Sequence, residues 1–353
     1  MRHLIDITEL TINELEKLME TAIDIDEHGE KYAHAMEGKI LATLFFEPST
    51  RTRLSFEAAF IKMGGNVIGF DNTISSSTAK GESLIDTIKT VSIYADIIAM
   101  RHFLEGAAFA AALNSSCPII NAGDGGHCHP TQTLADILTI KRETGRLDNL
   151  TIGVCGDLKY GRAVHSLINA LSRYKNNKFI LISPPELTLT DNYVKQVFDD
   201  NGICYERCNS IEEKVNSFDI LYMTRIQRER FDDAAMYERL KNSFELNVDM
   251  IKNAKPTMRI LHPLPRVTEI NTNVDNGPHA AYFKQVKNGM LMRMALILDL
   301  LKQKDNYYEN FNILDTEKKC QNNKCVVNSE RNVNNYQKKI EGQNVCAYCE
   351  KEF

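Results

Sequence analysis

The sequence lacks any long apolar segment. No uninterrupted run of apolar residues reaches the roughly 18 that a membrane-spanning helix requires. The N-terminal stretch MRHLIDITEL is interrupted by Asp6 and Glu9, which is not the pattern of a secretory signal. We therefore expect a cytoplasmic protein that has no membrane partner.

An excess of one charge is also missing. The chain of 353 residues has 42 basic and 47 acidic side chains, so its formal net charge is only -5. This balance gives no general attraction to nucleic acid or to a charged membrane surface. The length exceeds what one typical hydrophobic core serves, which predicts two globular domains.

The nine cysteines are unevenly distributed, because Cys320, Cys325, Cys346 and Cys349 crowd the C-terminal segment while the others are scattered. In a reducing compartment, such crowding indicates a metal rather than disulfides. Two close pairs of thiolates can meet at one tetrahedral ion, which predicts a closed, structural Zn²⁺ site. Free thiols are the alternative.

The segment that follows Gln303 is polar and rich in Asn. It cannot bury much apolar surface by itself, so it would be disordered unless something fixes it. Metal binding would supply the missing folding free energy. We therefore expect residues 306–353 to form a small zinc-ribbon-like tail domain.

Short apolar runs alternate with helical patterns in the rest of the chain, which predicts an α/β fold with parallel sheets. The expected strands are residues 39–46, 66–70, 96–101, 118–123, 151–157, 178–184, 219–225 and 259–265. The expected helices are a first helix after a capping box at Thr11 and Glu14, then 51–64, 83–95, 102–113, 129–145, 161–174 and 290–303. The expected domains are 1–130 with 288–305, and 131–287.

Polar and cationic residues follow the predicted strands. They are Ser49 to Arg53, Arg101 and His102, His127 to His129 with Gln132, Lys159 to Arg162, Arg225 with Gln227, and His262 to Arg266. Ligands of open α/β sheets bind beyond the carboxyl ends of the strands. The pattern therefore predicts a cleft between two domains that binds one or more anions.

The stretch Ser49 to Thr52 lies where a strand should give way to a helix. A helix N-terminus presents backbone N–H groups and a partial positive charge, which favour phosphate. Arg51 can add a charge-assisted contact. Arg53 is two positions further and should point elsewhere, in a structural role. The alternative is a helix start with surface arginines.

Each remaining position has a structural alternative. His129 alone is more often a structural histidine, Arg162 can be a surface residue at a helix start, and Arg225 can pair with Glu229. The glycine-containing loop GDLKYGR lacks the Lys-Ser/Thr pair of a nucleotide-binding P-loop. The functional interpretation rests on the convergence of all these positions at strand ends.

The motifs FFEPSTRTR, MRH, NAGDGGHCHPTQTLADI, GDLKYGR, YMTRIQRER and HPLPR resemble those of the catalytic chain of the aspartate carbamoyltransferases, in the same order. The resemblance covers about residues 1 to 305. STRTR and HPTQ are shared with ornithine carbamoyltransferases, whereas GDLKYGR and HPLPR favour aspartate. Pro263 stands where the ornithine enzymes have a cysteine.

The resemblance implies transfer of a carbamoyl group from carbamoyl phosphate to the amino group of L-aspartate, the opening of pyrimidine synthesis. It implies no redox or nucleotide cofactor and no covalent nucleophile, because the amine attacks the carbonyl directly. Catalysis would then rest on positioning and on stabilisation of an oxyanion. The alternatives are a carbamoyltransferase for another amino acid and an inactive scaffold with a zinc-ribbon interaction tail.

The resemblance also implies roles for individual residues. The phosphate would be held by Ser49, Thr50, Arg51 and Thr52, and the carbonyl oxygen would be polarised by Thr52, Arg101 and His129. The carbamoyl amino group would be bound by Gln132 and the Leu264 and Pro265 backbone, and the aspartate carboxylates by Arg162 and Arg225, with Gln227 beside them. Ser76 and Lys80 would come from a neighbouring subunit, which makes the minimum active unit a homotrimer or a higher assembly.

Two further expectations concern Glu47 and the tail. Glu47 could bridge Arg162 or Arg230 when the domains close, or be an exposed acid. The tail, which ends in CAYCEKEF, resembles the zinc domain of the separate regulatory chain of aspartate carbamoyltransferase. No stretch resembles the nucleotide-binding domain of that chain, so we expect a structural or assembly role for the tail.

Overall fold

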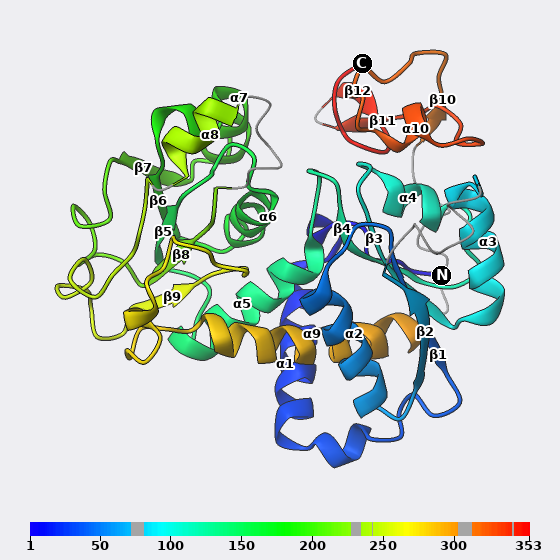
Figure 1. Ribbon diagram of the computed structural model, residues 1–353, viewed down its shortest axis with the longest axis horizontal. Coiled ribbons are helices and arrows are strands. Elements are labelled where there is room, and N and C mark those ends of the chain that lie inside the picture. The colour runs from blue at the N-terminus through cyan, green and yellow to red at the C-terminus, as the bar shows by residue number, and fades with distance from the viewer. Residues whose placement is uncertain (72–80, 227–233, 242, 303–312, 341) are drawn as a thin grey trace. The chain divides into compact units, whose positions relative to one another are not determined.

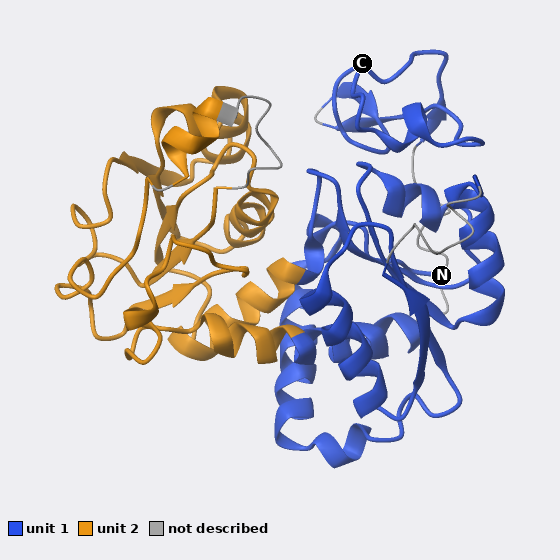
Figure 2. Ribbon diagram, viewed as in Figure 1, with its two compact units in different colours: residues 1–131, 290–353 blue, residues 132–289 orange. Residues whose placement is uncertain are grey.

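A computed structural model describes residues 1–71, 81–226, 234–241, 243–302, 313–340 and 342–353. The chain divides into two compact units, residues 1–131 with 290–353 and residues 132–289 (Figure 2). The division falls inside two helices, α5 (Pro130–Thr144) and α9 (Tyr282–Lys302), which both run from one unit into the other. The boundaries of the three expected domains stay a prediction.

The first unit is built on a parallel four-stranded sheet in the order β2-β1-β3-β4. Its strands are β1 (Ile40–Phe45), β2 (Asn66–Phe70), β3 (Ile97–His102) and β4 (Ile119–Asp124). Its helices are α1 (Ile12–Glu27), α2 (Thr50–Lys62), α3 (Leu84–Tyr94) and α4 (Ala107–Ala112), together with the C-terminal part of α9 (Figure 1). Strand β1 is almost wholly buried, which explains its uninterrupted apolar sequence.

The second unit contains a parallel five-stranded sheet in the order β7-β6-β5-β8-β9. Its strands are β5 (Thr151–Cys155), β6 (Lys178–Ile182), β7 (Cys204–Cys208), β8 (Ile220–Met223) and β9 (Arg259–Leu261). Its remaining helices are α6 (Arg162–Leu171), α7 (Asp191–Val194) and α8 (Ala234–Leu240). Both units therefore have the parallel α/β architecture that the alternation predicted.

The tail belongs to the first unit. It contains a three-stranded antiparallel sheet, β10 (Leu314–Asp315), β11 (Tyr336–Ile340) and β12 (Gln343–Cys346), and the short helix α10 (Val326–Ser329). Its four cysteines and Tyr348 pack in the same apolar cluster as the alanines of α4. Gly106, with φ of +80°, allows this approach, because a Cβ atom there would lie 2.5 Å from the Cβ of Tyr348.

Backbone hydrogen bonds fix the tail to the segment before α4. The Glu105 N–H donates to the Lys324 carbonyl at 2.8 Å, and the Val326 N–H donates to the Glu105 carbonyl at 2.9 Å. The Glu105 carboxylate accepts from Asn322 at 2.7 Å and lies 2.9 Å from the Lys351 ammonium. The tail therefore contacts its own chain through backbone, side-chain and apolar interactions.

All eight expected strands are present, seven of them within about two residues of their predicted ends. The eighth, expected over residues 259–265, ends at Leu261. The capping box of α1 is also confirmed, because the Thr11 and Glu14 side chains each accept from the other residue's backbone N–H. Strand β7 was not predicted, and α9 begins at Tyr282 rather than at Met290. Among the described helices, none is sufficiently long and apolar to traverse a lipid bilayer.

A buried histidine ties the N-terminus to β4. The Nδ1 atom of His3 accepts the Ile119 N–H at 3.0 Å, so this nitrogen must be unprotonated. Burial, with a smaller contribution from the charged N-terminus, lowers the pKa of His3 from 6.5 to about 3. Below about pH 6.5 His3 binds a proton in the unfolded chain but not in the folded protein. Its contribution to stability is therefore complete above about pH 6.5 and is lost as pH falls from there.

We predict that His3→Gln, which keeps an acceptor but cannot titrate, flattens the acid dependence of stability. Between pH 6.5 and 5 the wild type should lose up to about 2 kcal/mol of unfolding free energy through this one group. Urea unfolding at the two pH values measures the difference. His34→Gln, at an exposed histidine, should leave the pH dependence as it is. An unchanged dependence in His3→Gln would contradict the assignment.

Candidate active site

The carboxyl ends of β1, β3 and β4 are neighbours in the first sheet, because these strands are parallel and adjacent. The residues that follow β1 lead into α2, Arg101 lies near the end of β3, and the loop after β4 leads to His129. The strand order therefore brings these predicted site residues to one edge of the sheet.

Helix α2 begins at Thr50 with Ser49 as its N-cap residue. The Ser49 side chain does not cap the helix, and its hydroxyl donates instead to Thr52 Oγ1 at 3.0 Å. Arg51 is exposed in the first turn. This stretch thus combines helix N–H groups, three hydroxyls and a guanidinium, a combination suited to a phosphate.

Arg53 has the structural role that the sequence predicted. Its Nε atom donates to Glu57 at 2.7 Å, and its Nη1 atom lies 2.7 Å from an Asp71 carboxylate oxygen. Both partners lie in the same unit, one turn further along α2 and just after β2. Arg53 is therefore committed to ion pairs with Glu57 and Asp71.

Glu47 pairs with Arg101 in this structure. The Arg101 Nε atom donates to the Glu47 carboxylate at 3.1 Å, and the Phe46 N–H donates to the Arg101 carbonyl at 2.8 Å. These contacts orient the Arg101 guanidinium relative to the end of β1. The expected bridge from Glu47 to Arg162 or Arg230 stays a prediction.

The loop after β4 is organised by the buried carboxylate of Asp124. It accepts from the Asn121 side chain at 2.9 Å and from the N–H groups of Gly106 and Cys128 at 2.8 and 3.1 Å. His127 contributes a further contact at 3.1 Å. Burial opposes ionisation of Asp124, but the charge of His127 and the surrounding hydrogen bonds outweigh it and lower the pKa of Asp124. The loop thereby delivers His129, itself buried, to the start of α5.

The second sheet has the same arrangement, because β5, β8 and β9 are parallel neighbours. Arg162 begins α6 and is only 8% exposed, Arg225 follows β8, and Leu264 and Pro265 follow β9. Two arginines and a backbone loop therefore lie at one edge of this sheet. Gly156 permits the turn after β5, because a Cβ atom there would lie 2.2 Å from the Thr224 carbonyl oxygen.

His262 and Glu269 fasten the HPLPR loop. The Leu264 N–H donates to His262 Nδ1 at 2.8 Å, while His262 Nε2 contacts the Glu269 carboxylate at 2.8 Å. The other Glu269 oxygen accepts the N–H groups of Val267 and Thr268 at 3.0 and 3.1 Å. Burial lowers the pKa of His262, which keeps Nδ1 available as an acceptor. The Leu264–Pro265 peptide bond in this loop is cis.

Gln132 lies in the first turn of α5, where its Nε2 atom donates to Asp136 at 2.7 Å. Ser76, Lys80 and Gln227 lie outside the described residues. The roles assigned to all of these side chains stay predictions. The sequence analysis did not identify the buried carboxylates Asp124, Asp136 and Glu269. The only local signal was that Gln132 lies four positions before Asp136 on the same helix, a spacing at which two side chains can contact each other.

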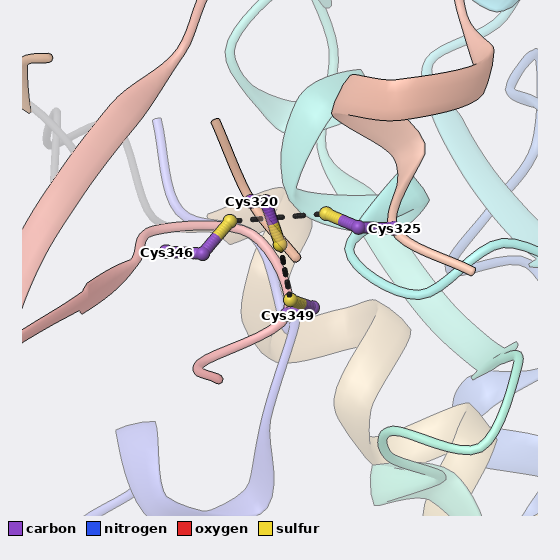
Figure 3. A group of neighbouring side chains, drawn as sticks. All are labelled: Cys320, Cys325, Cys346 and Cys349. Atoms are coloured by element: carbon purple, nitrogen blue, oxygen red, sulfur yellow. Dashed lines mark hydrogen bonds between the residues drawn. The ribbon is translucent and has the colours of Figure 1, made fainter. Parts of the chain in front are cut away.

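The four tail cysteines are buried, and their sulfur atoms all lie within 4.8 Å of one another (Figure 3). The Cys320–Cys349 and Cys325–Cys346 sulfur pairs are 3.5 and 3.8 Å apart. Tetrahedral Zn–S bonds of about 2.3 Å place sulfurs about 3.8 Å from one another, so the cluster has the dimensions of a Zn²⁺ site. Burial raises the pKa of Cys320 to about 12, so a cation would be needed to hold this thiol ionised near neutral pH.

The chain belongs to the aspartate/ornithine carbamoyltransferase family. Residues 2–142 match the carbamoyl-P binding domain of that family, and residues 148–300 match its Asp/Orn binding domain. Both matched ranges end before the tail.

Its relatives include the aspartate carbamoyltransferase catalytic subunits of Clostridium acetobutylicum and Clostridium perfringens. They are 57% and 58% identical over 300 residues, which cover 85% of this chain and 98% of each relative. The catalytic subunit of M. jannaschii aspartate transcarbamoylase has a TM-score of 0.79 at 46% identity, covering 86% of this chain and 98% of that one. Trypanosoma cruzi aspartate transcarbamoylase in complex with carbamoyl phosphate and aspartate has a TM-score of 0.80 at 36% identity, covering 85% and 96%.

We predict that Glu269→Gln destabilises the protein by about 1–3 kcal/mol. The two carboxylate oxygens of Glu269 bind His262 and the N–H groups of Val267 and Thr268, whereas a glutamine amide has one acceptor oxygen, and the site is buried. Chemical unfolding measures the loss. The matched control is Glu245→Gln, at an exposed carboxylate that accepts only an Asn271 side-chain bond among the described contacts. Equal stability of the two variants would show that Glu269 does not hold the loop.

Proposed function

We propose that this chain catalyses transfer of the carbamoyl group from carbamoyl phosphate to the amino group of L-aspartate, giving N-carbamoyl-L-aspartate and phosphate. The observation that carries the proposal is the set of anion-binding groups at the carboxyl edge of each sheet. The identity to aspartate carbamoyltransferase catalytic subunits over 98% of their length supports the same conclusion. The reaction opens pyrimidine biosynthesis.

The first unit would bind carbamoyl phosphate. Ser49, Thr50, Arg51 and Thr52 would hold the phosphate, whose charge matches the N-terminus of α2 and the Arg51 guanidinium. Arg101 and His129, with the Thr52 hydroxyl, would donate to the carbonyl oxygen. These groups stabilise the negative charge that this oxygen gains when the amine attacks.

The second unit would bind aspartate. Arg162 and Arg225 match its two carboxylates, which favours a dicarboxylic amine over ornithine. Pro263, in place of the cysteine expected of ornithine enzymes, supports the same preference. The amine of aspartate attacks the carbonyl carbon, the C–O bond to phosphate breaks, and phosphate leaves with that electron pair. The nitrogen loses one proton, which balances as the proton of the released hydrogen phosphate. The chemistry needs only positioning and charge stabilisation.

We also propose that the tail binds one structural Zn²⁺ through Cys320, Cys325, Cys346 and Cys349. Four sulfur ligands would close the coordination sphere, so the ion would take no part in the reaction. Its contribution would be to fold a segment that has little apolar content of its own. A cytoplasmic location would keep these thiols reduced.

The proposed active assembly is a homotrimer or a larger assembly in which Ser76 and Lys80 of one chain complete the site of a neighbour. Exposed apolar side chains of the first unit, among them Leu54 and Ile61 on α2 and Ile93 on α3, are consistent with subunit contacts. The tail would serve structure or assembly, without a nucleotide site of its own.

We predict that Arg51→Ala lowers kcat/KM with carbamoyl phosphate and L-aspartate by at least about a hundredfold, because a charge-assisted contact to phosphate is lost. Formation of carbamoyl aspartate is measured, with L-ornithine as the competing amine. Arg53→Ala is the control, because it removes the same charge two positions away but should mainly reduce stability. Wild-type activity with neither amine would reject the proposed function and favour the scaffold.

We predict that the purified protein contains about one zinc per chain and that Cys346→Ser loses most of it. Elemental analysis gives the metal content, and hydrogen exchange of β12 amides should accelerate in the variant because the tail unfolds locally. Cys204→Ser, at an exposed cysteine, should change neither quantity. A protein without metal whose tail is equally protected would reject the zinc site.

A further inference from the structure

Asp136 lies on α5 and is fully buried, yet it is not one of the residues to which the proposed reaction assigns a role. Its Oδ1 atom accepts from Gln132 Nε2 at 2.7 Å and from Gln285 Nε2 at 2.5 Å. Its Oδ2 atom accepts the Tyr222 hydroxyl at 2.9 Å. All of these residues belong to the second unit, so the network does not depend on the arrangement of the two units.

The carboxylate determines which end of the Gln132 amide faces it. A carboxylate only accepts hydrogen bonds, whereas an amide donates through nitrogen and accepts through oxygen. The Gln132 nitrogen must therefore point to Asp136, and its carbonyl oxygen must point away. Gln132 is thereby presented to any ligand as an acceptor rather than as a donor.

The same carboxylate reaches the loop after β9 through Gln285. The side-chain nitrogen of Gln285 donates to Asp136, and the side-chain oxygen of Gln285 accepts the backbone N–H of His262 at 3.1 Å. His262 in turn accepts the Leu264 N–H at 2.8 Å. One buried carboxylate thus connects Gln132 with the loop that carries Leu264 and Pro265.

We propose that Asp136 is a positioning residue that makes the site selective for a carbamoyl group over an isosteric acyl group. This inference rests on the proposed function, in which Gln132 and the Leu264–Pro265 backbone bind the carbamoyl amino group. That amino group donates two hydrogen bonds, so acceptors must face it. Acetyl phosphate has a methyl group at the same position and would leave those acceptors without donors, which is how the site would reject it.

The test compares carbamoyl phosphate, acetyl phosphate and inorganic phosphate as ligands of the full-length protein. In Asp136→Ala the Gln132 amide is no longer held in one orientation. The ratio of the acetyl phosphate to the carbamoyl phosphate dissociation constant should fall about tenfold, the size expected for one misplaced hydrogen bond. The affinity for inorganic phosphate should stay within about twofold, which a general collapse of the site would not allow.

Tyr222→Phe is the matched control. It also removes one hydrogen bond to Asp136, but from Oδ2, so Gln132 keeps its partner at Oδ1. It should lower stability and leave the discrimination between the two acyl phosphates intact. The proposal is overturned if Asp136→Ala discriminates like the wild type, or if its phosphate affinity falls in parallel with carbamoyl phosphate affinity.

A structure of the wild type with phosphonoacetamide, a stable amide analogue of carbamoyl phosphate, tests the same point if Asp136→Ala does not fold. Gln132 Nε2 should remain on Asp136, with Oε1 within hydrogen-bond distance of the ligand amide nitrogen. A Gln132 side chain that has left Asp136 would overturn the proposal. Assays of the wild type with L-aspartate run in parallel, and a wild type that forms no carbamoyl aspartate would reject the proposed function itself. If the wild type turns over normally but Asp136→Ala discriminates between the two acyl phosphates as the wild type does, only the role of Asp136 is rejected.

Discussion

The common direction of neighbouring strands is the constraint on which both units depend. Because hydrogen-bonded parallel strands end at the same side of a sheet, residues far apart in the chain meet there. The interiors of β1, β3, β5 and β8 are mainly apolar and buried, so they cannot carry the chemistry themselves. The polar residues must lie at the ends of these strands or just beyond them. Arg101 lies at the end of β3, and Arg225 follows β8.

Irregular segments after these strands carry N–H groups that no sheet ladder satisfies, and buried carboxylates accept many of them. Asp124 holds the loop after β4, and Glu269 holds the loop after β9. A buried carboxylate is costly unless its oxygens are fully bonded, but once bonded it fixes several groups at once. Such loops are rigid because their acceptors are internal, and rigidity is what a site built on positioning requires.

Local signals in the sequence predicted well, and signals that depend on tertiary contacts did not. The capping box of α1 and the apolar strands could be predicted from neighbouring residues, as could the clustering of the four tail cysteines. Strand β7 could not, because Cys204–Cys208 is an edge strand with little buried apolar sequence. The Asp136 network was equally hidden, since Gln285 lies 149 residues away. Positions at strand ends were predictable, whereas the groups that orient them were not.

The attachment of the tail beside Glu105 has a consequence for competition between molecules. A segment joined to its own docking surface by a short linker is present there at an effective concentration in the millimolar range. The backbone N–H and carbonyl of Glu105 are both occupied by the tail. Any separate protein that bound the same strip of backbone would have to displace a segment of the same chain, so the attachment reserves that surface for the tail.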